Sequence, residues 1–309
     1  MSIVIIRNDD KMQEWKTAIQ KQFPDTTVYT YDEPHVNEEI EMALVWKHPK
    51  GSLRMYPNLQ LISSLGAGVD FILDDETIPE NCAIVRVVDP LLASDMSAFV
   101  ISLLSNKQQH LAAYAMQQTN GVWNAIPTKR LNEYRVGILG YGALGAHLAT
   151  QLQQLGVPVC AWARTEKPEA PIPVYFSKGG WSNFLRQIDV VVCLLPLTPQ
   201  TEGILNASLF KQLPKGAYLI NVARGGHLDE QALLDALDSG QLSGASLDVF
   251  HTEPLPKEHP FWSHEKIQVT PHIASVSNPN AVVPQLIANY RNLKNNKPLM
   301  NVVSTEKGY

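Results

Sequence analysis

Cysteines are scarce in this chain, which argues against a disulfide framework or a cysteine-rich metal site. Three occur in 309 residues, at Cys82, Cys160 and Cys193, and two of them stand in apolar, strand-like runs. Nowhere do His, Cys and Asp residues cluster at the spacing of metal ligands. We therefore expect buried, reduced thiols, a reducing compartment and no bound metal.

Long apolar runs and an excess of basic residues are missing as well. No apolar stretch approaches membrane-spanning length, and the strand-like N-terminal segment is too short, with the wrong flanks, for a signal peptide. The 25 Lys and Arg are outnumbered by 30 Asp and Glu, which gives a net charge of -5. That balance gives no reason to expect a nucleic-acid partner. The expectation is a cytoplasmic globular protein without a membrane or nucleic-acid partner.

The chain does contain a regular alternation of strand-like and helix-like segments. Such alternation predicts mostly parallel sheets covered by helices. A helix capped by Asp10 is expected after the first strand. A long helix over residues 96–116, capped by Ser94 or Asp95, is expected at the crossing into a second domain.

The predicted fold class is therefore α/β, with two Rossmann-like, doubly wound domains and a cleft between them. A discontinuous substrate (catalytic) domain is predicted over residues 1–95 plus 280–309, because a chain that leaves such a sheet late often returns to the first domain. The dinucleotide-binding domain is predicted over residues 96–279.

A glycine-rich turn opens the second domain. Gly140, Gly142 and Gly145 follow a short apolar strand at G-x-G-x-x-G spacing and precede a helical segment. The first glycine permits a tight turn, the second a close approach to a pyrophosphate, and the third close packing of helix on strand. The N–H groups at the helix start would face the anion. We predict a dinucleotide site formed by Gly140, Tyr141, Gly142, Ala143, Leu144 and Gly145. An ordinary structural turn is the alternative.

The end of the next strand bears on which dinucleotide binds. An NAD site has an acidic residue here that holds the ribose 2′-hydroxyl. The first candidate in this chain is Arg164, followed by Thr165, and a guanidinium would pair with a 2′-phosphate instead. We predict that Arg164 and Thr165 bind NADP(H). Glu166 is the counter-candidate if the strand ends two residues later.

Three charged residues, Arg224, Glu253 and His272, follow successive strands of the second domain. Ligands bind outside the carboxyl ends of strands in open α/β sheets, so the three can converge. They suit the reduction of a 2-oxo acid. The arginine would fix the carboxylate and polarise the ketone, and the histidine would donate a proton to the developing alkoxide. The glutamate would orient the imidazole and raise its pKa. Each residue alone has a structural explanation, but their joint placement favours catalysis.

Two features of the first domain could contact a substrate. The turn Ser64-Leu-Gly-Ala-Gly-Val-Asp70 follows a strand, and its backbone amides could hold a carboxylate. Trp46 ends an apolar run and could line a pocket. An ordinary tight turn and simple core packing are the alternatives.

Several short motifs, spread over essentially the whole chain, occur together in one known family. They are Ala43-Leu-Val-Trp46, Leu65-Gly-Ala-Gly-Val-Asp70, Gly140-Tyr-Gly-Ala-Leu-Gly145, Trp162-Ala-Arg-Thr165, Leu195-Pro-Leu-Thr-Pro199, Asn221-Val-Ala-Arg-Gly225, Leu247-Asp-Val-Phe-His-Thr-Glu-Pro254, Thr270-Pro-His-Ile-Ala274 and Lys307-Gly-Tyr309. With them the chain resembles the D-isomer-specific 2-hydroxyacid dehydrogenases, and within that family the reductases of glyoxylate and hydroxypyruvate.

The resemblance implies roles for individual residues. It makes Arg224, Glu253 and His272 the catalytic triad, and it adds Trp46, Ala67 and Gly68 to Arg224 and His272 as substrate contacts. The cofactor contacts that it adds are Leu195, Pro196, Val222, Ala223 and Asp248, the last at the nicotinamide carboxamide. It also implies a homodimer built around the long helix and the arm that follows it.

The implied activity is NADPH-dependent reduction of small 2-oxo acids, glyoxylate to glycolate and hydroxypyruvate to D-glycerate, with His272 as general acid. Two alternatives stay open. One is a dehydrogenase of another D-2-hydroxy acid, such as a phosphoglycerate-like one. The other is a non-catalytic NAD(P)H-sensing protein on the same fold.

Overall fold

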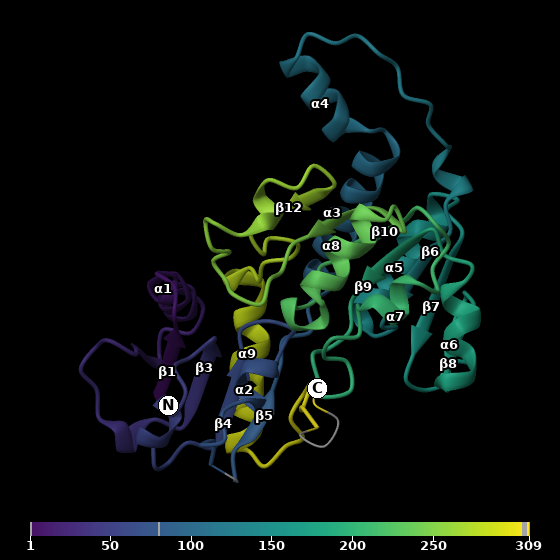
Figure 1. Cartoon of the computed structure of the whole chain (residues 1–309). Helices are drawn as coiled ribbons and strands as arrows, with labels where there is room; N and C mark the ends of the chain where they lie inside the picture. The colour runs from purple at the N-terminus through teal and green to yellow at the C-terminus, as the bar shows by residue number, and fades with distance from the viewer. Residues whose placement is uncertain (1, 80, 305–307, 309) are drawn as a thin grey trace. The chain divides into compact units, whose positions relative to one another are not determined.

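The computed structural model describes residues 2–79, 81–304 and 308, and the chain divides into two compact units (Figure 1). One unit comprises residues 1–90 and 276–309, and the other comprises residues 91–275. Of the closing Lys307-Gly-Tyr309 motif, only Gly308 is among the described residues.

The smaller unit is built on a parallel sheet, with five strands among the described residues. In spatial order they are β2, β1, β3, β4 and β5. Their bounds are β1 (Ser2–Arg7), β2 (Thr27–Thr30), β3 (Met42–Trp46), β4 (Leu61–Ser64) and β5 (Ala83–Val85). Strands β1 and β3 are buried at almost every position. Continuous apolar runs of this kind are what a parallel sheet covered on both faces requires.

Helices α1 (Met12–Gln22) and α9 (Pro279–Lys294) pack against each other in this unit, so the end of the chain rejoins its beginning. The short helix α2 (Asp70–Leu73) and the 3-10 helices η1 (Asn37–Glu39) and η2 (Ser52–Met55) lie in the connections. The predicted cap by Asp10 is wrong, because Lys11 is the N-cap residue of α1. The neighbouring Asp9 instead accepts a hydrogen bond from the Lys11 N–H, and Arg7 holds its carboxylate at 2.7 Å.

The larger unit contains a second parallel sheet, with seven strands among the described residues. Their spatial order is β12, β11, β10, β9, β6, β7 and β8. Their bounds are β6 (Val136–Leu139), β7 (Val159–Ala163), β8 (Val174–Phe176), β9 (Val190–Cys193), β10 (Ala217–Asn221), β11 (Leu242–Leu247) and β12 (Ile267–Val269). The strand order reverses between β6 and β9, as in a doubly wound fold. The prediction of two parallel α/β sheets is confirmed.

Helices cover both faces of the larger sheet. On one face α3 (Pro90–Gln108) and α5 (Ala143–Gln154) share a buried apolar cluster with Val190 and Val192 of β9. On the other face α6 (Ser177–Leu185), α7 (Ala207–Phe210) and α8 (Glu230–Asp238) share a cluster with Val191 and Cys193. Successive residues of β9 therefore point into opposite cores, and both cores fix the position of the strand ends.

The long helix predicted over residues 96–116 is two helices with other bounds. Helix α3 begins at Pro90, since proline suits the first turn of a helix, where its missing N–H is not needed. It ends at Gln108. His110, with a left-handed φ of 55°, separates it from α4 (Leu111–Thr119). Helix α4 and the stretch after it project away from the larger sheet (Figure 1).

The three cysteines are free, and their environments agree with the sequence-based expectation of reduced thiols. Cys160 on β7 and Cys193 on β9 are buried, while Cys82 is half-buried. Burial raises the pKa of Cys160 and of Cys193 to about 12, and that of Cys82 to about 11. A thiol with such a pKa stays protonated near neutral pH, so none of the three is an activated nucleophile.

Among the helices that the structure describes, none is both long enough and apolar enough to cross a membrane.

Candidate active site

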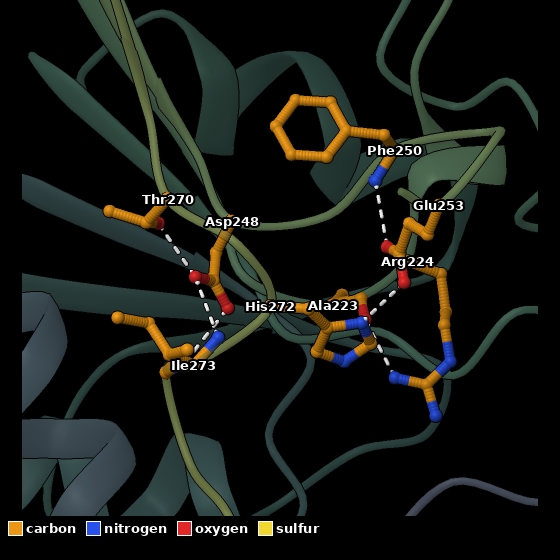
Figure 2. Close-up of polar contacts among 9 residues, drawn as sticks. Ala223, Arg224, Asp248, Phe250, Glu253, Thr270, His272 and Ile273 are labelled. Carbon is orange, nitrogen blue, oxygen red and sulfur yellow. Dashed lines mark hydrogen bonds and ion pairs between the residues drawn. The ribbon is translucent and has the colours of Figure 1, made fainter. Parts of the chain in front are cut away.

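The segments that follow β10, β11 and β12 bring together the three charged residues singled out in the sequence. Figure 2 shows the Arg224 guanidinium, the Glu253 carboxylate and the His272 imidazole gathered at this edge of the larger sheet. All three residues are half-buried, so they keep the access that a substrate would require. Adjacent parallel strands place their carboxyl ends at one edge, which explains how residues almost 50 positions apart converge.

Glu253 is fixed at both of its carboxylate oxygens. Its Oε1 accepts a hydrogen bond from the Phe250 N–H at 3.0 Å, and its Oε2 lies 2.8 Å from Nδ1 of His272. The backbone contact aims the carboxylate at the imidazole. Since a carboxylate can only accept, Nδ1 of His272 carries a proton, and the ring presents Nε2 on its other side.

His272 has a backbone conformation that few residues other than glycine adopt. Its φ is 53°, in the left-handed region. Its N–H donates to the Asp248 carbonyl oxygen at 2.8 Å and to that of Thr270 at 3.1 Å. Strained backbone persists only where its surroundings hold it, and it gathers at functional sites. This observation supports a functional assignment for His272.

Asp248 is completely buried and anchors the His272 segment. One carboxylate oxygen accepts hydrogen bonds from the Thr270 hydroxyl at 2.6 Å and from the Ile273 N–H at 3.0 Å, and the other accepts from the Ala274 N–H at 2.9 Å. Its carboxylate therefore shapes the loop around the histidine. The contact with a nicotinamide carboxamide, implied for Asp248 by the family resemblance, stays a prediction.

The backbone around Arg224 is held by hydrogen bonds from a nearby side chain, which the sequence did not reveal. Asn221, at the end of β10, is completely buried; its side-chain oxygen accepts from the Ala223 N–H, and its amide donates to the Arg224 carbonyl at 3.1 Å. The guanidinium donates from Nη1 to the Ala223 carbonyl at 2.7 Å. Asn221 stands in the Asn-Val-Ala-Arg motif, but nothing in the sequence alone showed that its side chain folds back on the loop.

The glycine turn after β6 has the geometry that a dinucleotide site needs. Gly140 has a φ of +105°, and a Cβ there would lie 2.8 Å from the Leu194 carbonyl oxygen. A Cβ on Gly145 would lie 2.0 Å from the Gly140 carbonyl oxygen, so both positions require glycine. A Cβ on Gly142, the N-cap of α5, would meet nothing within 4 Å. The first N–H groups of α5 have no acceptor within the helix, so a helix start of this kind suits an anion.

The other predicted cofactor contacts lie at the ends of neighbouring strands. Strand β7 ends at Ala163, so Arg164 and Thr165 are the first two residues beyond it, and both are exposed. Glu166 comes third, which favours the arginine over the glutamate at the strand end. The remaining predicted cofactor contacts follow β9 and β10 and are buried or half-buried: Leu195, Pro196, Val222 and Ala223.

Trp46, Ala67 and Gly68 belong to the smaller unit, at the ends of β3 and β4. The turn with Ala67 and Gly68 is held from inside, because the Ser64 hydroxyl donates to the Gly68 carbonyl at 2.7 Å and accepts from the Gly66 N–H. Trp46 packs so closely that a Cβ on Gly66 would lie 2.7 Å from its ring. The tryptophan and the turn therefore form one packed element.

The structure also bears on metal binding. In the described part of the chain, no group of three or more His, Cys, Asp or Glu side chains is placed to hold a metal ion.

Comparison with known proteins identifies the family of this site. A family model described as "D-isomer specific 2-hydroxyacid dehydrogenase, NAD binding domain" matches residues 101–274, which include the glycine turn and all three charged residues. The chain belongs to the D-isomer-specific 2-hydroxyacid dehydrogenase family. A curated relative, the glyoxylate/hydroxypyruvate reductase A of Yersinia enterocolitica, is 34% identical to this dehydrogenase over the whole of both chains.

Solved structures of relatives resemble the dehydrogenase over its full length. A D-isomer specific 2-hydroxyacid dehydrogenase from Xanthobacter autotrophicus Py2, in complex with NADPH and MES, shares 37% identity at a TM-score of 0.93, covering 100% of this chain and 99% of the other. An NADPH-dependent glyoxylate/hydroxypyruvate reductase from Sinorhizobium meliloti, in complex with NADP and sulfate, shares 32% identity at a TM-score of 0.93, with the same coverage. These complexes support the sequence-based prediction of NADP(H).

Proposed function

We propose that this dehydrogenase reduces small 2-oxo acids with NADPH, converting glyoxylate to glycolate and hydroxypyruvate to D-glycerate. The observation that carries the proposal is the 2.8 Å contact between His272 Nδ1 and Glu253 Oε2 beside the Arg224 guanidinium (Figure 2). The names of the Yersinia and Sinorhizobium relatives support the choice of substrates.

Each of the three residues has a distinct part in the proposed reaction. When it is bound, the nicotinamide supplies the hydride to C2 of the oxo acid. Arg224 binds the carboxylate of the substrate and polarises its ketone, since a guanidinium forms two parallel hydrogen bonds to such groups. His272 gives a proton from Nε2 to the oxygen that becomes the hydroxyl. Glu253 holds the ring in the orientation in which Nε2 faces the substrate.

The smaller unit contributes to substrate binding in this proposal. The amides of Ala67 and Gly68 hold the carboxylate, and Trp46 restricts the substrate to small acids. Support comes from the internal rigidity of this turn, which Ser64 and the tryptophan hold in place. Preorganised amides bind an anion without a cost for ordering the loop.

Identification of the products tests this function directly. Incubation of the protein with NADPH and glyoxylate is expected to yield glycolate, identified by mass spectrometry, and incubation with hydroxypyruvate is expected to yield D-glycerate, identified by chiral chromatography. Formation of L-glycerate, or loss of NADPH without a hydroxy-acid product, would refute the proposal.

The choice of NADPH over NADH is assigned to Arg164 and Thr165. Arg164→Gln is expected to lower kcat/KM for NADPH by about 10- to 100-fold, because charge-assisted bonds to the 2′-phosphate are lost. The value for NADH should change little. Glu166→Gln is the matched control, two residues further along the same exposed segment, and it should leave the ratio of the two cofactors unaltered. A shift in that ratio with the control and not with Arg164→Gln would assign the choice to the glutamate.

We also propose that the functional form is a homodimer, with α4 and the arm after it as the contact. Support comes from the apolar residues that this segment exposes to solvent, which are Leu111, Met116, Val122 and Trp123. Exposed apolar surface of this extent marks a site of association, and the resemblance names a second copy as the occupant. Light scattering should give a mass of twice the 34.3 kDa of one chain. For Trp123→Glu it should give the mass of a single chain. A monomeric parent protein would contradict the proposal.

A further inference from the structure

His227 connects two segments of the proposed site through one buried ring. It lies in the 3-10 helix η4 (Gly225–His227), directly after Arg224, and its side chain is 0% exposed. Its Nδ1 is 3.1 Å from the Arg224 carbonyl oxygen, and its Nε2 is 3.2 Å from the Pro196 carbonyl oxygen. One contact is on the segment of the proposed substrate arginine, and the other is on the segment proposed to touch the cofactor.

The chemistry of these two contacts constrains the charge of the ring. Both partners are carbonyl oxygens, which accept hydrogen bonds and cannot donate them. A neutral imidazole has one N–H, so its other nitrogen would direct a lone pair at a carbonyl oxygen. An imidazolium has two N–H groups and satisfies both contacts. Burial opposes the charged form, whereas two hydrogen bonds to it favour the charge.

Other ionisable groups border this segment. The Arg224 guanidinium, three residues earlier, opposes a positive charge on the ring. Asp229 favours this positive charge. It lies two positions after His227 and caps α8, where its side chain accepts a hydrogen bond from the Ala232 N–H. His251 approaches from the loop after β11, with its Nε2 2.7 Å from the Leu228 carbonyl oxygen.

We propose that His227 is a positioning residue, whose doubly protonated ring sets the spacing between the Arg224 segment and the Pro196 segment. The inference rests on the proposed function, since that function gives the two segments their substrate and cofactor roles. Backbone hydrogen bonds join the same regions, from Gly203 N–H to the Gly226 carbonyl and from Leu205 N–H to the His227 carbonyl. Loss of the ring is therefore expected to shift the segments without unfolding the unit.

The charge of the ring can be measured without substrate. Selective ¹⁵N labelling of the nine histidines, with the His227 signals assigned by their loss in His227→Asn, reports the protonation of each ring nitrogen. We expect both nitrogens of His227 to be protonated at pH 7 in the full-length protein. A single neutral tautomer would overturn the inference. Because this experiment needs no turnover, its outcome is independent of the proposed function.

A pair of variants separates the two contacts. The amide nitrogen of Asn can take the place of Nδ1, and that of the longer Gln the place of Nε2. His227→Asn keeps the Arg224 contact and loses the Pro196 contact, so the Kd and KM for NADPH should rise about five- to tenfold, with the KM for glyoxylate little changed. His227→Gln keeps the Pro196 contact and loses the Arg224 contact, so the KM for glyoxylate should rise while the Kd and KM for NADPH change little.

The control is His259→Gln. His259 accepts from the Phe261 N–H and contacts Glu230, away from the proposed site, so this change should leave every constant as it was. Equal losses in both His227 variants, or none in either, would reduce His227 to a packing residue. The Kd for NADPH, measured by fluorescence, tests the predicted effect on cofactor binding even if glyoxylate is not a substrate.

Discussion

Replacement of His272 by alanine should lower kcat for glyoxylate reduction by about 100-fold or more, because the proposed proton donor to the new hydroxyl is removed. The kcat of His272→Asn should fall by the same factor. It is the cleaner variant, since asparagine tolerates the left-handed φ of 53° that alanine does not. Steady-state rates at saturating NADPH measure the effect, and NADPH binding should stay intact.

The control for this result is a second histidine–glutamate pair in the same unit. His259 contacts Glu230 at 3.2 Å through Nε2, whereas His272 contacts Glu253 at 2.8 Å through Nδ1, and the first pair does not lie at the strand ends that carry the candidate site. His259→Ala should leave kcat unchanged. A His272→Asn protein with the parent kcat would remove the histidine from its role as general acid.

Replacement of Arg224 by lysine should lower kcat/KM for glyoxylate by about 100- to 1000-fold, although the charge is kept. Lysine cannot offer the two parallel N–H groups that bind a carboxylate and polarise a ketone together. The proposed mechanism needs both contacts, so the loss should appear in kcat and in KM. The dissociation constant for NADPH should change little.

Arg135→Lys provides the comparison, because Arg135 is an exposed arginine of the same unit whose guanidinium donates to the Gln187 side chain at 3.3 Å. Its kinetic constants should equal those of the parent. If Arg224→Lys also kept the parent kcat/KM, the carboxylate would have to bind elsewhere.

Much of this architecture can be predicted from local sequence. The need for glycine at Gly140 and Gly145 could be predicted from their spacing. The structure explains this need, because a Cβ at either position would collide with backbone atoms. Arg224, Glu253 and His272 could be placed because each follows a readable apolar strand. Parallel topology then brings strand ends to one edge without further information.

What could not be predicted depends on contacts between distant residues. The brace formed by Asn221 and the anchoring of His272 by Asp248 follow from side chains that turn back on the backbone. The break at His110 between α3 and α4 has no glycine or proline to mark it.

The most direct test is the steady-state oxidation of NADPH and, separately, of NADH, with glyoxylate, hydroxypyruvate and phosphohydroxypyruvate as substrates. Fast turnover of glyoxylate and hydroxypyruvate with NADPH, and slow turnover with NADH or with the phosphorylated acid, is the predicted result. It would support Arg164, Trp46 and the three charged residues together. Tight NADPH binding without turnover of any of the three acids would contradict the account and favour a protein that senses the cofactor.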